Sequence, residues 1–290
     1  MNRALVAIRT NRWSDEEQQL LDRLRQAELG DIAIVFHDRP DGFVPPAPAI
    51  DVNDAWVQAN NLRITGDWGW RCGDYFYYAM RQARPEFDYY WLIEPDVFFT
   101  DNPKGFFDLC GDVSHDLLGF RPEPHTERGP FVRGLRGVDL YRALFAMTRI
   151  SGRAIDTLFA QRVEYSSVPR PERTHTNDEL FVFSNAMANP DLSVGDLEVI
   201  APEWFEGAHF ATNPDIITDA VPRNFASGRI FHPVRSHDGY CRALAQRLTT
   251  WPGYLGRSQP SIAHLSDDEI DEIANLASER MKTMLKAVRG

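Results

Sequence analysis

Cysteines are scarce in this sequence of 290 residues, which contains only Cys72, Cys110 and Cys241. They are far apart and odd in number, and they form neither a CxxC pair nor a spacing typical of a zinc site. Long apolar runs are also missing. No stretch approaches the ~20 residues of a membrane-spanning helix, and the N-terminal run is too short for a signal peptide. We therefore expect a cytoplasmic protein with reduced thiols and no integral membrane segment.

An excess of basic residues is absent as well. The 31 lysines and arginines are outnumbered by 42 acidic residues, which gives a formal net charge of −11. Such a charge disfavours wholesale binding to nucleic-acid phosphates, so no nucleic-acid partner is expected. A hydrophobic content of 43% is that of an ordinary globular protein. Without repeats or low-complexity tracts, the chain is most simply one domain with a helical tail.

The beginning of the chain predicts alternating strands and helices. Ala4–Ile8 and Asp31–Phe36 are short apolar runs typical of buried strands, and between them Ser14 and Glu17 have capping-box spacing. A strand–helix–strand start favours a parallel sheet. Further strands are predicted at Asp88–Ile93, Asp116–Phe120 and Leu197–Ile200, and helices at Tyr75–Ala83, Pro103–Leu109, Val138–Ile150, Ala154–Val163, Thr176–Ala188 and from Ser266 onward. The expected fold class is α/β, with a mostly parallel central sheet flanked by helices.

One predicted strand, in the segment Tyr90–Val97 (YWLIEPDV), runs directly into two carboxylates, Glu94 and Asp96. Acidic residues are depleted in strands, and ligands of open α/β sheets bind beyond the carboxyl ends of the strands. Because the two residues are two positions apart, both side chains can point to one face of an extended segment. Carboxylate oxygens suit a hard cation such as Mg²⁺ or Mn²⁺. The alternative is that Asp96 and Asp101 only cap the turns around Thr100–Pro103.

The segment YYWLIEPDVFF, residues 89–99, resembles the strand that ends in the DXD motif of glycosyltransferases with the GT-A fold. In that family the motif coordinates a divalent metal and the diphosphate of the donor. Asp96 matches the second aspartate, whereas Glu94 replaces the first, which leaves open whether Glu94 is a direct ligand. The resemblance covers residues 1–235 in order. It implies a catalytic domain at 1–260, with a Rossmann-like nucleotide-sugar-binding half at 1–120 and an acceptor half at 121–260, followed by a C-terminal helix at 261–290.

The resemblance also implies roles for residues far from the motif. His232, in the run RIFHP, would complete the metal site, with His237 as a nearby alternative, and imidazole suits Mn²⁺ better than Mg²⁺. Asp178 would be the general base for the acceptor proton if the reaction inverts the anomeric centre, and would bind a sugar hydroxyl if it retains it. Thr176 and Glu179 have capping-box spacing, so Glu179 is expected to be structural or to contact the acceptor.

Donor contacts are implied at the ends of the first two strands and at the turn Trp68–Asp74, because the N-terminal amides of the following helix favour anions. The implied nucleotide-sugar ligands are Arg9, Thr10, Asn11, Asp38, Arg71, Asp74 and Glu94. The alternative is that Trp68 and Trp70 pack in the core and that Asp74 only caps the helix. Trp204 would stack on an acceptor sugar or pack in the core.

Together these features predict a metal-dependent glycosyltransferase of the hexosyltransferase kind, with the inverting route favoured. It would use Mn²⁺ or Mg²⁺ to move a sugar from a UDP- or GDP-type donor to the hydroxyl of a glycan or other acceptor. A nucleotidyltransferase is one alternative, but it would carry a glycine-rich loop after the first strand, where this chain has Arg9–Trp13 (RTNRW). A non-catalytic carbohydrate- or nucleotide-binding protein is the other.

Overall fold

The computed structural model describes residues 3–126, 129, 131–135, 137–206, 209–212, 215–218, 221, 228–250 and 265–289. The chain forms two compact units. The first consists of residues 1–95 and 102–204, and the second of residues 96–101 and 205–290. These units divide the chain at other positions than the predicted halves, and the assignment of donor and acceptor halves stays a prediction. Among the helices in the described ranges, none combines the length and apolar character that a bilayer span requires.

The first unit is built on a seven-stranded sheet. Its strands are β1 (Ala4–Thr10), β2 (Asp31–His37), β3 (Ala49–Val52), β4 (Tyr89–Ile93), β6 (Leu117–Pro124), β7 (Tyr141–Ser151) and β8 (Val194–Asp196). They lie in the order β3-β2-β1-β4-β7-β6-β8, in which β7 is antiparallel to both neighbours and the other adjacent pairs are parallel. The predicted α/β class with a mostly parallel central sheet flanked by helices is confirmed.

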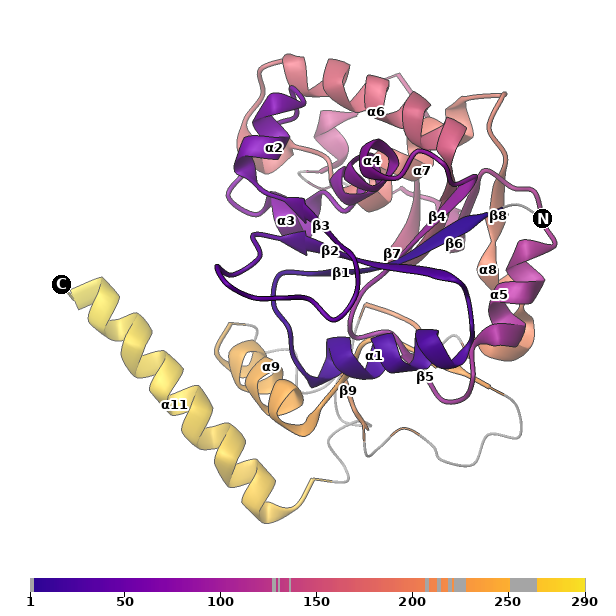
Figure 1. Ribbon diagram of the computed structural model, residues 1–290. Helices are drawn as coiled ribbons and strands as arrows, with labels where there is room; N and C mark the ends of the chain where they lie inside the picture. The colour runs from indigo at the N-terminus through magenta and orange to yellow at the C-terminus, as the bar shows by residue number, and fades with distance from the viewer. Residues whose placement is uncertain are drawn as a thin grey trace. The chain divides into compact units, whose positions relative to one another are not determined.

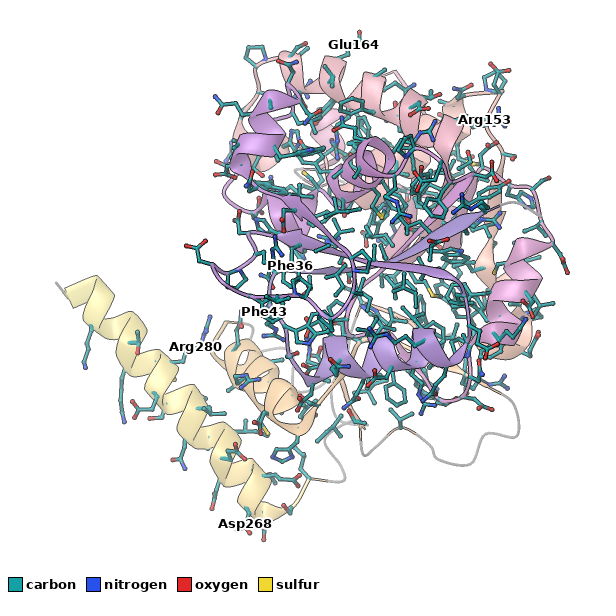
Figure 2. All side chains as sticks on the ribbon, viewed as in Figure 1. Phe36, Phe43, Arg153, Glu164, Asp268 and Arg280 are labelled. Carbon is teal, nitrogen blue, oxygen red and sulfur yellow. The ribbon has the colours of Figure 1, made fainter. Side chains whose placement is uncertain are left out.

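Helices cover both faces of this sheet (Figure 1). They are α1 (Asp15–Gln26), α2 (Asp54–Ala59), α3 (Trp68–Arg71), α4 (Asp74–Ala83), α5 (Lys104–Gly111), α6 (Gly152–Ser167), α7 (Asp178–Ala188) and α8 (Leu197–Ile200). Alternation along β1 sends Leu5 and Ala7 into the core beneath α4, α6 and α7, so Val6 and Ile8 are buried on the opposite face. On that opposite face Phe36 packs edge-on against Phe43, with ring centroids 5.6 Å apart (Figure 2).

Two sequence-based assignments are wrong. Val138–Ile150 was expected to be helical, but β7 occupies Tyr141–Ser151. This strand is buried along almost its whole length between β4 and β6, so it shows no polar alternation, and its Ala, Leu and Met residues favour a helix by propensity alone. Leu197–Ile200 was expected to be a strand but forms α8, because the side chain of Asp196 caps the turn by accepting a hydrogen bond from the amide of Glu198.

The described residues of the second unit form short strands and two helices. Strand β5 (Phe98–Phe99) pairs antiparallel with β10 (Ile230–Phe231), and β9 (Ile216–Ile217) pairs parallel with β11 (Val234–Arg235). Helix α9 (His237–Thr250) contacts α11 (Asp267–Arg289). The predicted cap of the tail helix is confirmed, since the Glu269 carboxylate accepts from the Ser266 amide at 2.6 Å and the Glu269 amide donates to the Ser266 hydroxyl.

Candidate functional site

In the first unit, polar side chains gather where β1 and β4 end. Ile8 of β1 is paired with Ile93 of β4, so Arg9 and Glu94 follow at the same carboxyl edge of the parallel sheet. Arg9 Nη1 lies 3.2 Å from Glu94 Oε1, and its Nη2 donates to the carbonyl oxygens of Gly69 and Trp70 at 2.6 and 2.8 Å. The buried guanidinium therefore holds Glu94 and the α3 backbone together. These partners give Arg9 a role in positioning the site, and the donor contact expected from sequence stays a prediction.

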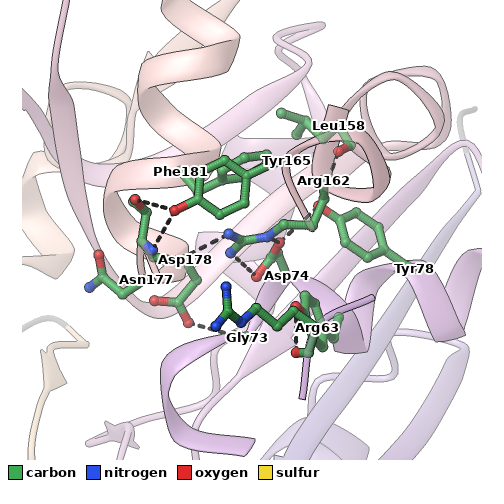
Figure 3. A network of polar contacts seen from close by, with 12 residues as sticks. Arg63, Gly73, Asp74, Tyr78, Leu158, Arg162, Tyr165, Asn177, Asp178 and Phe181 are labelled. Atoms are coloured by element: carbon green, nitrogen blue, oxygen red, sulfur yellow. Dashed lines mark hydrogen bonds and ion pairs between the residues drawn. The ribbon is translucent and has the colours of Figure 1, made fainter. Parts of the chain in front are cut away.

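Asp178 stands at the first position of α7 and points to the same guanidinium. Its Oδ2 accepts a hydrogen bond from the Gly73 amide at 2.7 Å (Figure 3). The same Oδ2 lies 3.7 Å from Arg9 Nη1, and Oδ1 accepts from the Glu179 amide at 2.8 Å. Burial raises the pKa of Asp178 to about 8, with Glu179 and Asp74 adding to the rise while Arg9 and the Gly73 amide oppose it. A carboxyl group that titrates near neutral pH is suited to taking and giving a proton.

Gly73 makes the approach of these groups possible. A Cβ atom at this position would lie 2.5 Å from both Arg9 Nη1 and Asp178 Oδ2, and 3.0 Å from the Phe145 ring. We expect Gly73→Ala to push Asp178 and Arg9 apart and to lower activity at least tenfold, since small misplacements of catalytic groups cost about 100-fold. Steady-state kinetics measures this loss. Gly111→Ala is the matched control because a Cβ there meets nothing within 4 Å, and equal activity of the two variants would contradict the role of Gly73.

Asp74, a donor contact expected from sequence, has a buried ion-pair partner. Arg162 of α6 donates to both of its carboxylate oxygens, from Nε at 2.6 Å and from Nη2 at 2.8 Å, and the Tyr78 hydroxyl donates to Oδ2 at 2.9 Å (Figure 3). Both side chains of this ion pair are almost completely buried. Arg162 Nη1 also donates to the Thr176 carbonyl just before α7, so the ion pair joins α4, α6 and the start of α7. We therefore assign Asp74 to the interior that positions Asp178.

The expected capping box at Thr176 and Glu179 is wrong. The cap of α7 is Asn177, whose side chain accepts from the Leu180 amide, while the buried Thr176 hydroxyl donates to the Phe131 carbonyl at 2.7 Å. Glu179 is thus not needed as a capping residue. Burial raises the pKa of Glu179, and Glu94 adds to the rise. The Glu94 carboxyl group therefore acts on that of Glu179, which adjoins Asp178.

Of the remaining donor contacts expected from sequence, Thr10 and Arg71 are buried, whereas Asn11 and Asp38 are exposed. Thr10 is buried, and its hydroxyl faces the Arg12 carbonyl and Glu17 of α1, at 2.6 and 2.7 Å. Arg71 is held by Asp67 at 2.6 Å and by the Glu172 carbonyl at 2.8 Å. Both residues have partners in the loops around them, and their donor contacts stay predictions.

Three other side chains are exposed near the strand ends. Asn11 and Asp38 follow the parallel neighbours β1 and β2 and are exposed at that edge of the sheet, where a ligand has access to them. Trp68 is buried as expected, but Trp70, assigned to the core as one alternative, is 68% exposed. Trp70 was missed as a candidate ligand contact. It belongs to α3, whose carbonyl groups hold Arg9.

Asp96 and His232 lie together in the second unit. His232 Nδ1 lies 2.8 Å from the Ala211 carbonyl, an acceptor that requires the proton on Nδ1 and directs the Nε2 lone pair outward. That Nε2 lies 3.4 Å from Asp96 Oδ1, and Asp96 Oδ2 lies 3.1 Å from Arg235 Nη2. Burial raises the pKa of Asp96, but His232 and Arg235 outweigh it and lower the pKa to about 2. The pair offers a carboxylate oxygen and an oriented imidazole nitrogen to a cation.

Trp204 was expected either to stack on an acceptor sugar or to pack in the core. Trp204 is buried and packs edge-on against Phe106 of α5, with ring centroids 5.9 Å apart, so it is a core residue and not an acceptor platform.

Arg162 was missed by sequence reasoning. A signal for it exists, because Ile155, Leu158 and Arg162 recur at helical spacing on the buried face of α6. An arginine on such a face requires a buried acidic partner.

The sequence matches no family model and no curated protein. Solved structures give distant likenesses. One is a galactosyltransferase, LgtC, in complex with donor and acceptor sugar analogues, at 9% identity over 79% of this chain and 87% of that chain, with a TM-score of 0.42. Mouse xyloside xylosyltransferase 1 matches at 12% identity over 69% and 86%, with a TM-score of 0.39. A putative glucose-1-phosphate thymidylyltransferase from Bacillus anthracis matches at 9% identity over 66% and 86%, with a TM-score of 0.38.

By name these are two glycosyltransferases and one nucleotidyltransferase, the two enzyme classes that the sequence considerations singled out. At TM-scores this low, the likenesses carry no argument about the activity of this chain. The activity is therefore inferred from the residues around Arg9 and Asp178 and from the pair Asp96 and His232.

Proposed function

We propose that the protein is a metal-dependent glycosyltransferase that moves a sugar from a nucleoside-diphosphate donor of the UDP or GDP type to an acceptor hydroxyl. The observation that carries the proposal is the pair Asp96 and His232. The imidazole is oriented by a backbone carbonyl, as in protein metal sites, and its Nε2 faces a carboxylate oxygen 3.4 Å away. Without a cation, this arrangement needs a proton on Nε2. A cation between Asp96 Oδ1 and His232 Nε2 would be bound by both atoms.

The chemistry of these donor atoms fits Mn²⁺ better than Mg²⁺, because one of them is an imidazole nitrogen. Asp96 and His232 would hold the ion, and Glu94, joined to Asp96 through Pro95, is the third candidate ligand. When bound, the metal would neutralise charge on the departing nucleoside diphosphate. Arg235, 3.1 Å from Asp96 Oδ2, fixes the orientation of the carboxylate and leaves Oδ1 toward His232.

Asp178 supports the inverting route as the group that takes the acceptor proton. The base must reach that proton directly or through one water molecule, and a pKa near the working pH makes it effective in both directions. The pKa of about 8 comes from burial, while the Gly73 amide, the Glu179 amide and Arg9 fix the position of the carboxyl group. Asn11 and Asp38, exposed at the same sheet edge, are candidate donor contacts in the first unit, and so is Glu94.

Nucleotidyl transfer is less well supported by the loop after β1. The N-terminus of α1, which follows that loop, is already filled by its own acidic side chains Asp15, Glu16 and Glu17, and Glu17 accepts from the Ser14 amide at 2.8 Å. Amides that are capped in this way do not offer a cradle for the phosphates of a nucleoside triphosphate.

Asp96→Asn tests the metal assignment. We expect this variant to lose the Mn²⁺-dependent part of UDP or GDP binding, because an amide is a much weaker ligand than a carboxylate for a divalent cation. Thermal unfolding of the wild type with nucleotide at one hundred times Kd should show about 2.7 kcal/mol of stabilisation that needs Mn²⁺. Asp101→Asn, an exposed carboxylate in the same segment, is the control and should keep the effect. Unchanged Mn²⁺-dependent binding in Asp96→Asn would overturn the assignment.

A further inference from the structure

Helices α9 and α11 of the second unit bring together side chains that the proposed reaction does not use. The helices lie side by side and share an apolar core that includes Tyr240, Leu244 and Ile273 (Figure 1). At its edge, His237 and Cys241 lie one turn apart on α9, and Glu272 faces them from α11. The i, i+4 spacing places the imidazole and the thiol on the same side of α9. The three ligand atoms lie within 4.8 Å of one another.

Two of the three separations between these atoms are close to those between ligands of a tetrahedral zinc ion. With Zn–S and Zn–N bonds of about 2.3 and 2.05 Å, tetrahedral geometry puts sulfur and nitrogen about 3.6 Å apart, and nitrogen and carboxylate oxygen about 3.3 Å apart. In the structure, Cys241 Sγ lies 3.8 Å from His237 Nε2, and Glu272 Oε2 lies 3.3 Å from the same Nε2. The two distances from His237 Nε2 therefore suit ligands of one zinc ion.

The other nitrogen of His237 has the partner that a metal-bound histidine usually has. Its Nδ1 lies 3.3 Å from Oε1 of Glu269, one turn before Glu272 on α11. A carboxylate on Nδ1 fixes the ring and requires the proton there, so the Nε2 lone pair of the neutral imidazole is directed toward Cys241 and Glu272. A lone pair facing a carboxylate and a sulfur is satisfied by a cation between them.

We propose that His237, Cys241 and Glu272 bind one Zn²⁺, with Glu269 orienting the imidazole. Thiolate and imidazole select zinc over magnesium or manganese, so this site differs in chemistry from the pair Asp96 and His232. Cys241 is buried, whereas His237 and Glu272 are partly exposed and give the ion a path from solvent. The ion joins α9 to α11 and thereby holds the C-terminal helix in place. The site could not be predicted from the sequence, because its ligands come from two helices and include only one cysteine.

Cobalt substitution tests the proposal on the full chain. The protein is stripped with a chelator and titrated with Co²⁺ alone, and then with Zn²⁺ in competition. We expect one equivalent of Co²⁺ to produce thiolate-to-cobalt charge-transfer absorption, which requires a sulfur ligand, and Zn²⁺ to displace it. Cys241→Ser should abolish the absorption, whereas Cys110→Ser, at another buried cysteine, should keep it. Asp96→Asn should also keep it, which separates this site from the proposed catalytic metal.

Two milder variants test the site even if Cys241→Ser does not fold. Glu272→Gln, at a side chain that is 47% exposed, should weaken Co²⁺ and Zn²⁺ binding at least tenfold. Glu269→Gln should weaken it by about 10- to 100-fold, as expected for a residue that orients a ligand. Absence of the charge-transfer absorption in the wild type, its persistence in Cys241→Ser, or unchanged affinity in Glu272→Gln would each overturn the site.

Discussion

Replacing Asp178 by asparagine is expected to lower kcat for sugar transfer by about 100- to 10,000-fold, the contribution typical of a positioned general base. Asparagine keeps the size of the side chain and an oxygen that can accept from the Gly73 amide, but it cannot take the acceptor proton. The assay measures kcat with one nucleotide-sugar donor in the presence of Mn²⁺. Asp156→Asn, which removes a carboxylate from a surface ion pair with Arg81, is the control and should keep wild-type activity. A kcat within twofold of wild type in Asp178→Asn would remove the base assignment.

The pH dependence gives an independent view of the same carboxyl group. Since a base must be deprotonated, kcat/KM should rise with pH up to about 8, the pKa of Asp178, and level off above it. Stability should change in the opposite direction. The folded-state pKa lies above the ordinary 3.8, so the folded protein binds the extra proton, and the stability from this group is lost as pH rises from about 4 through about 8. Denaturant unfolding of wild type and Asp178→Asn at several pH values measures this difference.

Replacing Arg162 by methionine is expected to destabilise the fold by about 3–5 kcal/mol, because it leaves the Asp74 carboxylate buried without its cation. Burial lowers the pKa of Arg162, but Asp74 outweighs it and raises the pKa, so the guanidinium stays charged. The ring of Phe181 lies 3.8 Å from the guanidinium carbon, so the variant loses a cation–π contact as well. Urea unfolding measures the change.

The control for this variant is Arg81→Met, which breaks the more exposed pair with Asp156 and should cost about 0–1 kcal/mol. The double variant Asp74→Leu with Arg162→Met should recover part of the loss, since it no longer buries an unpaired charge. A cost below about 1 kcal/mol for Arg162→Met would show that the ion pair does not support the position of α7.

Local sequence signals predicted the first part of the fold well. The apolar runs of β1, β2 and β4 are short, continuous and followed by polar residues, because these parallel strands are buried on both faces. The predicted box of Ser14 and Glu17 caps α1. The same signals placed Arg9 and Glu94 at the ends of predicted strands. The structure shows that these strands are parallel neighbours, so both residues lie at one carboxyl edge of the sheet.

Partners that are distant in the sequence could not be predicted in this way. The antiparallel strand β7 is set by pairing with β4 and β6, and no local pattern of its residues distinguishes it from a helix. Asp74 was read as a ligand for sugar because its buried partner, Arg162, comes from another helix. The exposure of Trp70 likewise depends on how α3 packs against Arg9.

The central claim is tested most directly by incubating the protein with UDP- and GDP-sugars, a panel of hydroxyl acceptors and Mn²⁺, and analysing the products by mass spectrometry and anomeric NMR. We predict release of a nucleoside diphosphate together with a new glycosidic bond, both lost on chelation of the metal and in Asp96→Asn. Sugar transfer that survives chelation, or pyrophosphate release from a nucleoside triphosphate and a sugar 1-phosphate in its place, would contradict the account.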